Sequence, residues 1–502
     1  MFDKNYRESV VMQNLYDSFI FAELDGSISP NVAKDWKISE DGLSYEFDIQ
    51  EGIKFHDGSE LNADDVVYSM NRMLEIGQGY SYLYEGYVKN IEKVDDYKVI
   101  VNMNKPYGPF IASLVRFYVL NEDLIKENYD QDSAEYGENK DYGKNWLLTN
   151  GAGSGPYKMT EMNMGESMIA QLNEDYWKEL DPNVPKFFKC ISWTEPSTVR
   201  TLMSRRELDI ADEWQSIENV NALDQIEGVD VEYLHAGSMG SIELNTKKSP
   251  TDCIHFRKAL AYLIDYETVI TQIYPDSIQP VGPVASVYNG HDESLYQYTL
   301  DKEKALEELK QSIYYDDLEN QVFTLGWSAD VPDEEKIALM LQANAAELGI
   351  NIEIYKEPYS NLVEQAASPE ATHNGVIFYP ADSYNEAGSV LNMRYHSNTT
   401  GTILQYEWLQ NDEIDAAIED SLSTINKEER FEKYSEIQEA IIELSPTIWV
   451  FENFERRAYQ SYLTWEAAEY AERGELNCPI MGRFIYLPEI KIDTEMKTEM
   501  ME

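Results

Sequence analysis

Polar and apolar residues alternate near the start of the chain, just after the turn dipeptide Asp41-Gly42. Three apolar side chains are separated by polar residues there, as in a strand with one buried face: Tyr45, Phe47 and Ile49. Asn62 is suited to cap a helix, and apolar residues recur behind it at helical spacing, namely Val66, Val67, Met70, Met73 and Leu74. This stretch therefore predicts a strand, a turn and a helix.

The second half of the chain alternates strand and helix patterns. Residues 322–325 are mainly apolar, as in a buried strand, and Pro332 then opens a helical pattern that ends before Gly349. Residues 350–354 again alternate in the manner of a strand. This strand–helix–strand order predicts that the two strands are parallel neighbours in one sheet. Two further amphipathic helices are predicted, at 414–425 and 431–444.

Length and charge narrow the possible classes of protein. The 502 residues are enough for about three domains, and an apolar content of 43% is ordinary for a globular protein. The 92 acidic and 40 basic residues give a net charge of -52, which excludes a nucleic-acid partner because phosphates would be repelled. Two interpretations of the charge stay open: a solvated acidic shell, or a field that steers a cationic ligand.

No pattern of reactive or metal-binding residues stands out. The three cysteines form no C-x-x-C pair, and their odd number still allows one disulfide. None of the six histidines has a partner four residues away, so neither a metal nor another cofactor is expected. G-x-S-x-G and H-E-x-x-H are both absent, which predicts a protein that is not an enzyme. No run of 18 apolar residues predicts a membrane span, and the first ten residues lack a hydrophobic signal core.

Residues 30–72 carry four motifs in order: P-x-x-A-x-x-W, D-G-x-x-Y-x-F, F-x-D-G and A-x-D-V. Their residues here are Pro30, Ala33, Trp36, Asp41, Gly42, Tyr45, Phe47, Phe55, Asp57, Gly58, Ala63, Asp65 and Val66. This stretch resembles the extracellular solute-binding proteins of ABC importers, family 5, which bind oligopeptides and dipeptides. The resemblance extends from about residue 14 to residue 493, with further matches at 150–157, 172–177, 206–211 and 244–265.

The resemblance implies an α/β fold of the periplasmic-binding-protein-like type II, with two lobes and an extra inserted domain (cluster C type). On this numbering the first lobe is expected at 1–20, 153–238 and 456–502, the extra domain at 21–152, and the second lobe at 239–455. In the family an upstream segment supplies an export signal and often a lipid-bearing cysteine. Membrane contact is therefore expected only through a lipid anchor missing from this chain.

Three glycines cluster where the chain is expected to leave the extra domain. Gly151, Gly153 and Gly155 precede Pro156. A phosphate-binding loop is disfavoured here because no Lys-Ser/Thr follows and Pro156 has no N–H to donate. We interpret the glycines as a source of backbone freedom at the junction.

The ligand site is expected within residues 374–393, which resemble the family's W-x-A-D-Y-x-[DE]-P motif. The resemblance matches Asp382 to the carboxylate that binds a peptide's α-ammonium. The alternative is that Asp382 only caps the turn before Tyr384. Tyr379 stands where the family has Trp, and Pro380 has no N–H for pairing with an extended peptide, which weakens the peptide assignment.

Aromatic residues supply a second indication, because 36 tyrosines is a large number for 502 residues. Such rings stack on sugars or line side-chain pockets. Together with Asp382 and Tyr379, the residues expected to bind ligand are Tyr384, Asn385, Trp327, Ser238, Met239, Trp449 and Tyr82.

The resemblance implies a monomeric solute-binding component of an ABC importer. It is expected to work outside the cytoplasm, in a periplasm or as a cell-surface lipoprotein of a Gram-positive organism. There it would capture a peptide between its lobes and deliver it to the transmembrane subunits of the permease. The alternatives are an oligosaccharide or a nickel chelate on the same scaffold; the tyrosines favour a sugar, and Asp382 favours an amine.

Overall fold

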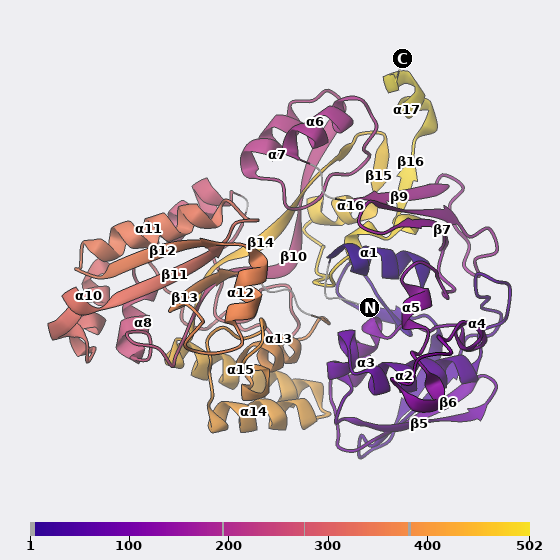
Figure 1. The fold of residues 1–502 in the computed structure, drawn as a ribbon, viewed down its shortest axis with the longest axis horizontal. Helices are drawn as coiled ribbons and strands as arrows, with labels where there is room; N and C mark the ends of the chain where they lie inside the picture. The colour runs from indigo at the N-terminus through magenta and orange to yellow at the C-terminus, as the bar shows by residue number, and fades with distance from the viewer. Residues whose placement is uncertain (1–5, 193–194, 276, 380–382, 502) are drawn as a thin grey trace.

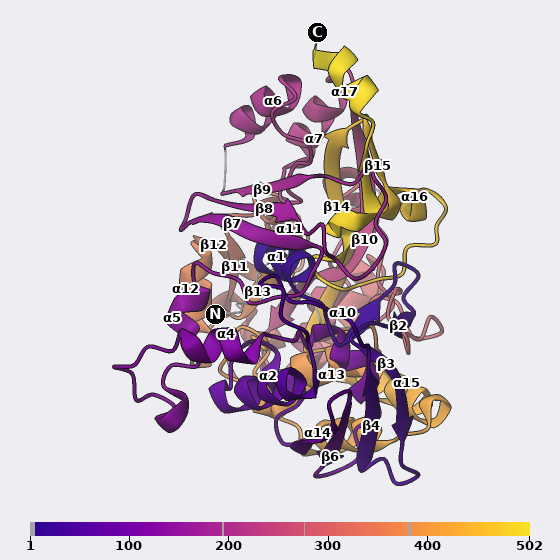
Figure 2. The ribbon, with the colours of Figure 1, turned by 90° about the vertical axis from the view of Figure 1, so that its right-hand side faces the viewer.

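The computed structural model describes residues 6–192, 195–275, 277–379 and 383–501. Two bodies are joined by a pair of long strands, and one body holds both ends of the chain (Figures 1 and 2). The other body runs from α8 (Ile254–Ala261) to α15 (Lys427–Leu444).

A four-stranded antiparallel sheet in the order β3-β4-β6-β5 forms the centre of the predicted extra domain. The strand predicted near Tyr45 is β4, and α2 (Ala63–Ile76) packs on β5 and β6. The predicted helix start is confirmed, because Asn62 and Asp65 form a capping box. The strands are β3 (Ala33–Ile38), β4 (Ser44–Ile49), β5 (Val88–Asp95) and β6 (Lys98–Met103); beside them lie β1 (Ile20–Ala22), β2 (Ile28–Pro30), α3 (Phe110–Ser113), α4 (Glu122–Glu127) and α5 (Lys144–Leu147).

The second body is built on a five-stranded sheet in the order β12-β11-β13-β10-β14. β11 (Val322–Ser328) runs parallel to β12 (Asn351–Glu357) and to β13 (Gly375–Phe378), and α11 (Glu334–Ala346) connects the first two. The predicted parallel pair is therefore confirmed. The remaining helices of this body are α9 (Tyr266–Thr268), α10 (Lys302–Gln311), α12 (Tyr359–Gln365), α13 (Ala387–Tyr395) and α14 (Asp412–Ser423).

The two long strands that join the bodies are β10 (Val229–Leu244) and β14 (Thr447–Gln460), which pair antiparallel. Their pairing is interrupted between His235 and Met239, so the ladder has an irregularity where the strands pass from one body to the other. The boundaries predicted at 238/239 and 455/456 fall on these strands, and the division into domains stays a prediction.

The body that holds both chain ends is assembled from distant segments. Asn14 donates from Nδ2 to the Ile485 carbonyl at 2.7 Å and accepts from the Leu487 N–H at 2.9 Å. The elements of this body are α1 (Tyr6–Leu15), β7 (Tyr157–Asn163), β8 (Ser167–Leu172), β9 (Phe187–Ile191), α6 (Pro196–Ser204), α7 (Ile217–Asp224), β15 (Leu463–Trp465), α16 (Glu466–Glu472), β16 (Ile490–Ile492) and α17 (Thr494–Met501).

The glycines at the junction serve a different purpose from the one expected. Neither Gly153 nor Gly155 has a positive φ, so backbone freedom is not what they provide. A Cβ on Gly153 would overlap the Leu15 carbonyl oxygen, and one on Gly155 would lie 2.6 Å from the Leu15 carbonyl carbon and 2.7 Å from the Tyr16 nitrogen. These glycines are needed because two backbones touch.

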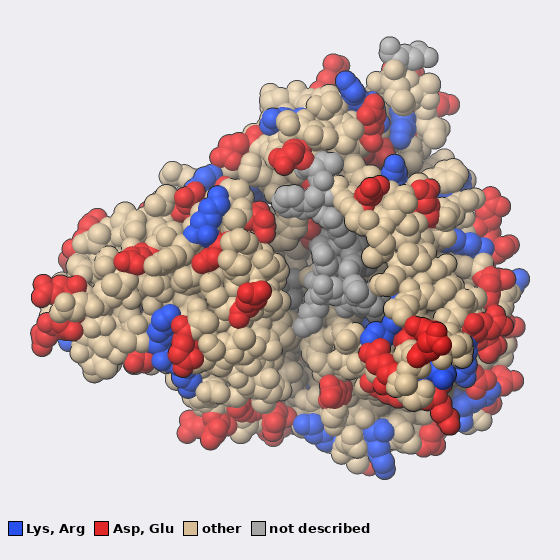
Figure 3. Space-filling model, in the orientation of Figure 1, with Lys and Arg blue, Asp and Glu red and all other residues tan. Residues whose placement is uncertain are grey.

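Acidic side chains are scattered over both bodies on the face shown in Figure 3, as in a solvated acidic shell. None of the three cysteines is joined in a disulfide, so the disulfide that the sequence left open is not formed. Within the described ranges, no helix is both long enough and apolar enough to cross a membrane.

Candidate functional site

The loop after β13 is where the sequence placed the ligand. Pro380 and Asp382 lie outside the described residues, and Ser383 is the first described residue after them. Ser383 lies in the second body but meets two side chains of the extra domain. Its hydroxyl forms a hydrogen bond with that of Tyr82, and its carbonyl accepts from Arg116 Nε at 2.7 Å.

The next two residues of this loop also reach across to the other body. The Tyr384 hydroxyl lies 3.1 Å from that of Tyr107 in the extra domain, and both rings are buried. Asn385 donates from Nδ2 to the carbonyls of Gly26 at 3.2 Å and Asn477 at 3.0 Å. The structure thus brings the predicted residues Tyr82, Tyr384 and Asn385 together, at a contact between the two bodies.

Arg116 belongs to this site and was not predicted. Its side chain is 2% exposed, and Nη1 donates to the Met481 carbonyl at 3.2 Å, so one guanidinium ties the extra domain to the second body and to the carboxyl-terminal segment. The guanidinium lies 4.9 Å from the Tyr80 ring centre. The sequence did hold a signal, because an arginine inside the apolar run 114–120 needs buried partners.

A buried ion pair holds the loop in place at its far end. Glu386, the N-cap residue of α13, accepts from Arg430 Nε at 2.7 Å and from Arg430 Nη2 at 3.0 Å. The Tyr434 hydroxyl donates to the same carboxylate at 2.7 Å. Such a bidentate pair fixes direction as well as distance, so it orients the start of α13 and the loop before it.

Tyr379, at the end of β13, joins an aromatic cluster in the second body. Its hydroxyl lies 2.5 Å from that of Tyr274, whose ring stacks on Phe451 with centres 4.0 Å apart. Arg456 lies over the Tyr274 ring at 4.9 Å. Burial raises the pKa of Tyr379 well above its usual range, with a further contribution from Tyr274, so the phenol stays protonated.

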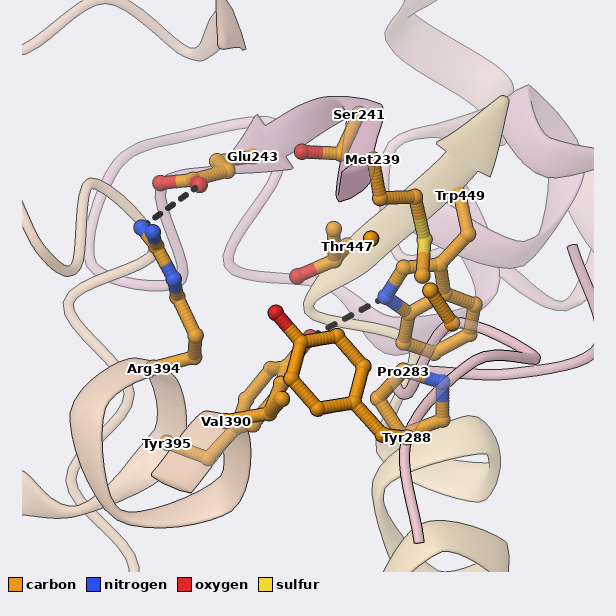
Figure 4. Close-up of a pocket in the computed structure, with 12 residues that line it drawn as sticks. Met239, Ser241, Glu243, Pro283, Tyr288, Val390, Arg394, Tyr395, Thr447 and Trp449 are labelled. Carbon is orange, nitrogen blue, oxygen red and sulfur yellow. Dashed lines mark hydrogen bonds and ion pairs between the residues drawn. The ribbon is translucent and has the colours of Figure 1, made fainter. Parts of the chain in front are cut away.

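Met239 and Trp449 line a small pocket inside the second body, with a volume of about 20 Å³ (Figure 4). Trp449 donates from Nε1 to the Tyr395 hydroxyl at 3.0 Å. Glu243 also lines the pocket, and its carboxylate lies 3.9 Å from Arg394. The volume suits about one water molecule and no larger group.

A second buried carboxyl, that of Glu407, accepts a hydrogen bond at 2.6 Å from Thr447, which lines the pocket. Burial raises the pKa of the Glu407 carboxyl well above its usual range, and the neighbouring Glu243 raises it further. Burial also raises the pKa of Glu243, although Arg394 opposes that shift. Both carboxyls are 1% exposed. Arg394 pairs with Glu243, and burial together with the neighbouring Glu243 favours the retention of a proton by Glu407.

The other predicted residues lie in separate places. Ser238 is half-buried at the irregularity in the β10–β14 ladder, where its hydroxyl accepts from Asn453 Nδ2 at 3.2 Å. Trp327 lies near the end of β11 but is 1% exposed, with Lys356 5.1 Å from its ring centre. Their ligand roles stay predictions. Among the residues that the structure describes, no three His, Cys, Asp or Glu side chains are grouped to hold a metal ion.

A cavity of about 400 Å³ adjoins the loop, between the extra domain and the second body. Asn385 and Glu386 line it from the loop, and Ile111 and Ala112 line it from α3. Volumes of about 300 Å³ and above are typical of small-molecule sites, so this space is large enough to matter for binding.

Comparison with known proteins gives the family of the chain. The family described as bacterial extracellular solute-binding proteins, family 5, matches residues 27–402. The chain belongs to this family. Its members are solute-binding proteins of transport rather than enzymes, and the resemblance found in the sequence is confirmed.

Named relatives of this family 5 protein cover most of its length. The probable D,D-dipeptide-binding periplasmic protein DdpA of Escherichia coli K12 is 25% identical, over 85% of this chain and 79% of its own. Heme-binding protein A of Haemophilus influenzae is 26% identical, over 87% of this chain and 81% of its own.

Solved structures give the fold. The periplasmic binding protein DppA of Helicobacter pylori, in complex with the peptide STSA, superposes with a TM-score of 0.79 at 21% identity, covering 98% of this chain and 95% of that one. This likeness confirms the predicted fold class, α/β of the periplasmic-binding-protein type II. The second body is called the second lobe below, and the limits of the lobes stay a prediction.

Proposed function

We propose that this family 5 protein captures a peptide between its lobes, outside the cytoplasm, and passes it unchanged to the membrane subunits of an ABC importer. One observation carries the proposal: residues 383–385 of the second lobe are held against the extra domain by hydrogen bonds. A ligand bound beside this loop would contact both lobes at once. Binding would then favour the closed form, which is the form a permease recognises.

Asp382 is the proposed anchor for the ligand's amino group, because it directly precedes the loop that bridges the lobes. A carboxylate in a site closed off from water makes a strong bond to an ammonium. Two similar proteins support a peptide: one is described as a probable D,D-dipeptide-binding protein, and the other was solved in complex with the peptide STSA. The oligosaccharide alternative loses support, because the buried rings of Tyr384 and Tyr107 hydrogen-bond to each other and offer no free face.

A thermal-shift screen tests the proposal, using dipeptides to tetrapeptides, cello- and xylo-oligosaccharides, nickel–histidine and heme. A ligand at 100 times its Kd stabilises by about 2.7 kcal/mol, which should raise the Tm by about 2–3 °C for a chain of this size. We expect peptides alone to do so. A shift with sugar, chelate or heme, and none with any peptide, would overturn the assignment.

Calorimetry then tests Asp382. The Asp382→Asn variant should bind a peptide hit at least about tenfold more weakly, because a charge-assisted bond is lost. Acetylation of the peptide's amino group should weaken binding to the natural protein by a similar factor, and should change little in the variant. Unchanged affinity in Asp382→Asn would remove the role of this residue.

A further inference from the structure

Another pocket, of about 70 Å³, lies in the body that holds both chain ends and the extra domain. Met12 on α1, Arg72 and Met73 on α2, and Arg116 just after α3 are among the residues that line it. We call it the arginine pocket. Of the described residues that line it, none belongs to the second lobe, so this pocket is not part of the space between the lobes.

The arginine pocket is positively charged in a strongly acidic protein. The chain carries 92 acidic residues and a net charge of -52, yet none of the described residues that line this pocket is acidic. Arg72 and Arg116 line it, and so does Lys144, which is already paired with Glu135 at 2.7 Å. The two arginines are therefore the charges that need an explanation.

Both arginines are removed from water, since Arg72 is 4% exposed and Arg116 is 2% exposed. A buried charge is costly unless an opposite charge compensates it. Burial lowers the pKa of Arg72, and the side chains that oppose this shift are tyrosines rather than carboxylates. The side chains that act on Arg116 are tyrosines as well. Because arginine stays charged in proteins, two buried positive charges lack a counterion among the described residues.

The hydrogen bonds of Arg72 leave most of its donors unused. Its Nε donates to the Tyr142 carbonyl at 3.0 Å, whereas neither Nη atom donates to a residue that the structure describes. The nearest acid along α2, Glu75, accepts from the Tyr142 hydroxyl instead. Both Nη groups of Arg72 therefore remain for another acceptor.

Arg116 has an unused donor as well. Its Nε and Nη1 donate to the carbonyls of Ser383 and Met481, but Nη2 is buried and donates to no group in the described part of the chain. The Tyr118 hydroxyl interacts with this guanidinium, but burial raises its pKa to about 12, so it brings no negative charge. A buried donor without an acceptor is costly, so Nη2 marks a place for one.

Much of the remaining lining is apolar, which narrows the kind of anion. Met73 and Ile76 are half-buried there, and Phe117 and Leu120 are buried. The volume of about 70 Å³ has room for roughly five waters at about 10–15 Å³ each, which is close to the number of heavy atoms in a short-chain carboxylate. Its two oxygens match the planar fork of a guanidinium, and its chain matches the apolar lining. Inorganic phosphate fits less well, because its other oxygens would face apolar side chains.

We propose that the arginine pocket binds a small aliphatic carboxylate, such as butyrate, through Arg72 and Arg116. This anion is a second ligand, distinct from the captured peptide, and its site does not depend on the proposed function. The Nε and Nη1 atoms of Arg116 already hold Ser383 and Met481. A carboxylate on Nη2 would therefore complete the bonds of the guanidinium that connects the extra domain to the second lobe.

Calorimetry in Tris chloride buffer, on the natural protein and without any peptide, tests the site. Butyrate should bind with a Kd of about 1 mM or lower. Butyramide, its neutral counterpart, should bind at least about tenfold more weakly because it lacks the charge, and inorganic phosphate should also bind at least about tenfold more weakly. Absence of butyrate binding, equal binding of butyramide, or a preference for phosphate would overturn this proposal and leave the peptide function standing.

Arg72→Met removes one of the two charges and should weaken butyrate binding at least about tenfold. Arg205→Met, at an exposed arginine of the same body, changes the net charge equally and is the matched control. Its Kd for butyrate should stay within about threefold of the natural protein. Equal effects of the two variants would overturn the proposal, because net charge rather than the pocket would then attract the anion.

A variant that supplies the anion from within the chain covers the case in which Arg72→Met does not fold. Met73→Glu places a carboxylate at a half-buried position on the lining, and Met73→Gln is its neutral control. The Glu variant should lose butyrate binding and unfold at a higher urea concentration than the Gln variant, because its carboxylate would pair with the buried arginines. A Glu variant that still binds butyrate, or that unfolds at the same or a lower urea concentration, would overturn the proposal.

Discussion

Removing the Glu386 carboxylate tests how much a buried ion pair stabilises the candidate site. Glu386 is 5% exposed and Arg430 is 4% exposed, and they are joined by bonds of 2.7 and 3.0 Å. In Glu386→Met the guanidinium would keep only its bonds from Nη1 to the carbonyls of Thr424 at 2.9 Å and Ile425 at 3.1 Å. Breaking one side of a buried pair costs about 3–5 kcal/mol, because the remaining charge is unpaired. We expect a loss of unfolding free energy in that range.

Two companion variants separate charge from shape. Glu386→Gln keeps an oxygen that accepts from Arg430 or Tyr434, so it should lose only about 1–3 kcal/mol. The double variant Glu386→Met/Arg430→Met leaves no unpaired charge, and it should unfold at a higher urea concentration than Glu386→Met alone. Urea unfolding followed by tryptophan fluorescence provides the comparison.

Two results would refute this reasoning. The first is a Glu386→Met variant within about 1 kcal/mol of the natural protein, which is the size of an ordinary surface substitution. The second is a double variant that loses the full sum of the two single losses, since that would mean the two side chains do not act as a pair.

Two further stability predictions follow from buried groups near the junction of the extra domain and the first lobe. Burial lowers the pKa of His56 to about 4 from 6.5, although its bond to the Gly155 carbonyl opposes the shift. As the pH drops, the unfolded chain therefore takes up this proton before the folded protein does. The free energy of unfolding is unaffected well above pH 6.5 and falls as the pH drops toward 4, by about 2 kcal/mol at pH 5. Urea unfolding of His56→Gln at pH 7 and pH 5 should lack that loss, and an equal loss in both proteins would contradict the assignment. Gly153→Ala should lower the unfolding free energy by about 2 kcal/mol or more, because its Cβ would overlap the Leu15 carbonyl. Gly151→Ala, whose Cβ meets nothing closer than 4.0 Å, is its control and should leave the unfolding free energy nearly unchanged. Urea unfolding of both variants provides the comparison.

Much of the fold is visible in the sequence because local patterns decide it. The capping box at Asn62 and the parallel pair β11–β12 both follow from spacing within about thirty residues. The role of Gly153 was missed because its partner is Leu15, far away in the chain. Contacts of that kind leave no periodic trace in the sequence.

The candidate site was predicted in part. Tyr82, Tyr384 and Asn385 were placed by the resemblance, and the structure brings them together. Glu386 was missed because one functional carboxylate does not stand out among 92 acidic residues. Trp327 was expected near the ligand because it lies at the end of a strand; it is 1% exposed, and its ligand role stays a prediction.

The bonds of Asn14 to Ile485 and Leu487 bear on how the chain is made. The first of them joins residues 471 positions apart, and a ribosome releases the chain from its amino end. The body that holds Asn14 therefore cannot complete these contacts until residues 485–487 have been synthesised. Throughout that interval the nascent polypeptide stays accessible to chaperones and to any machinery that handles unfolded chains.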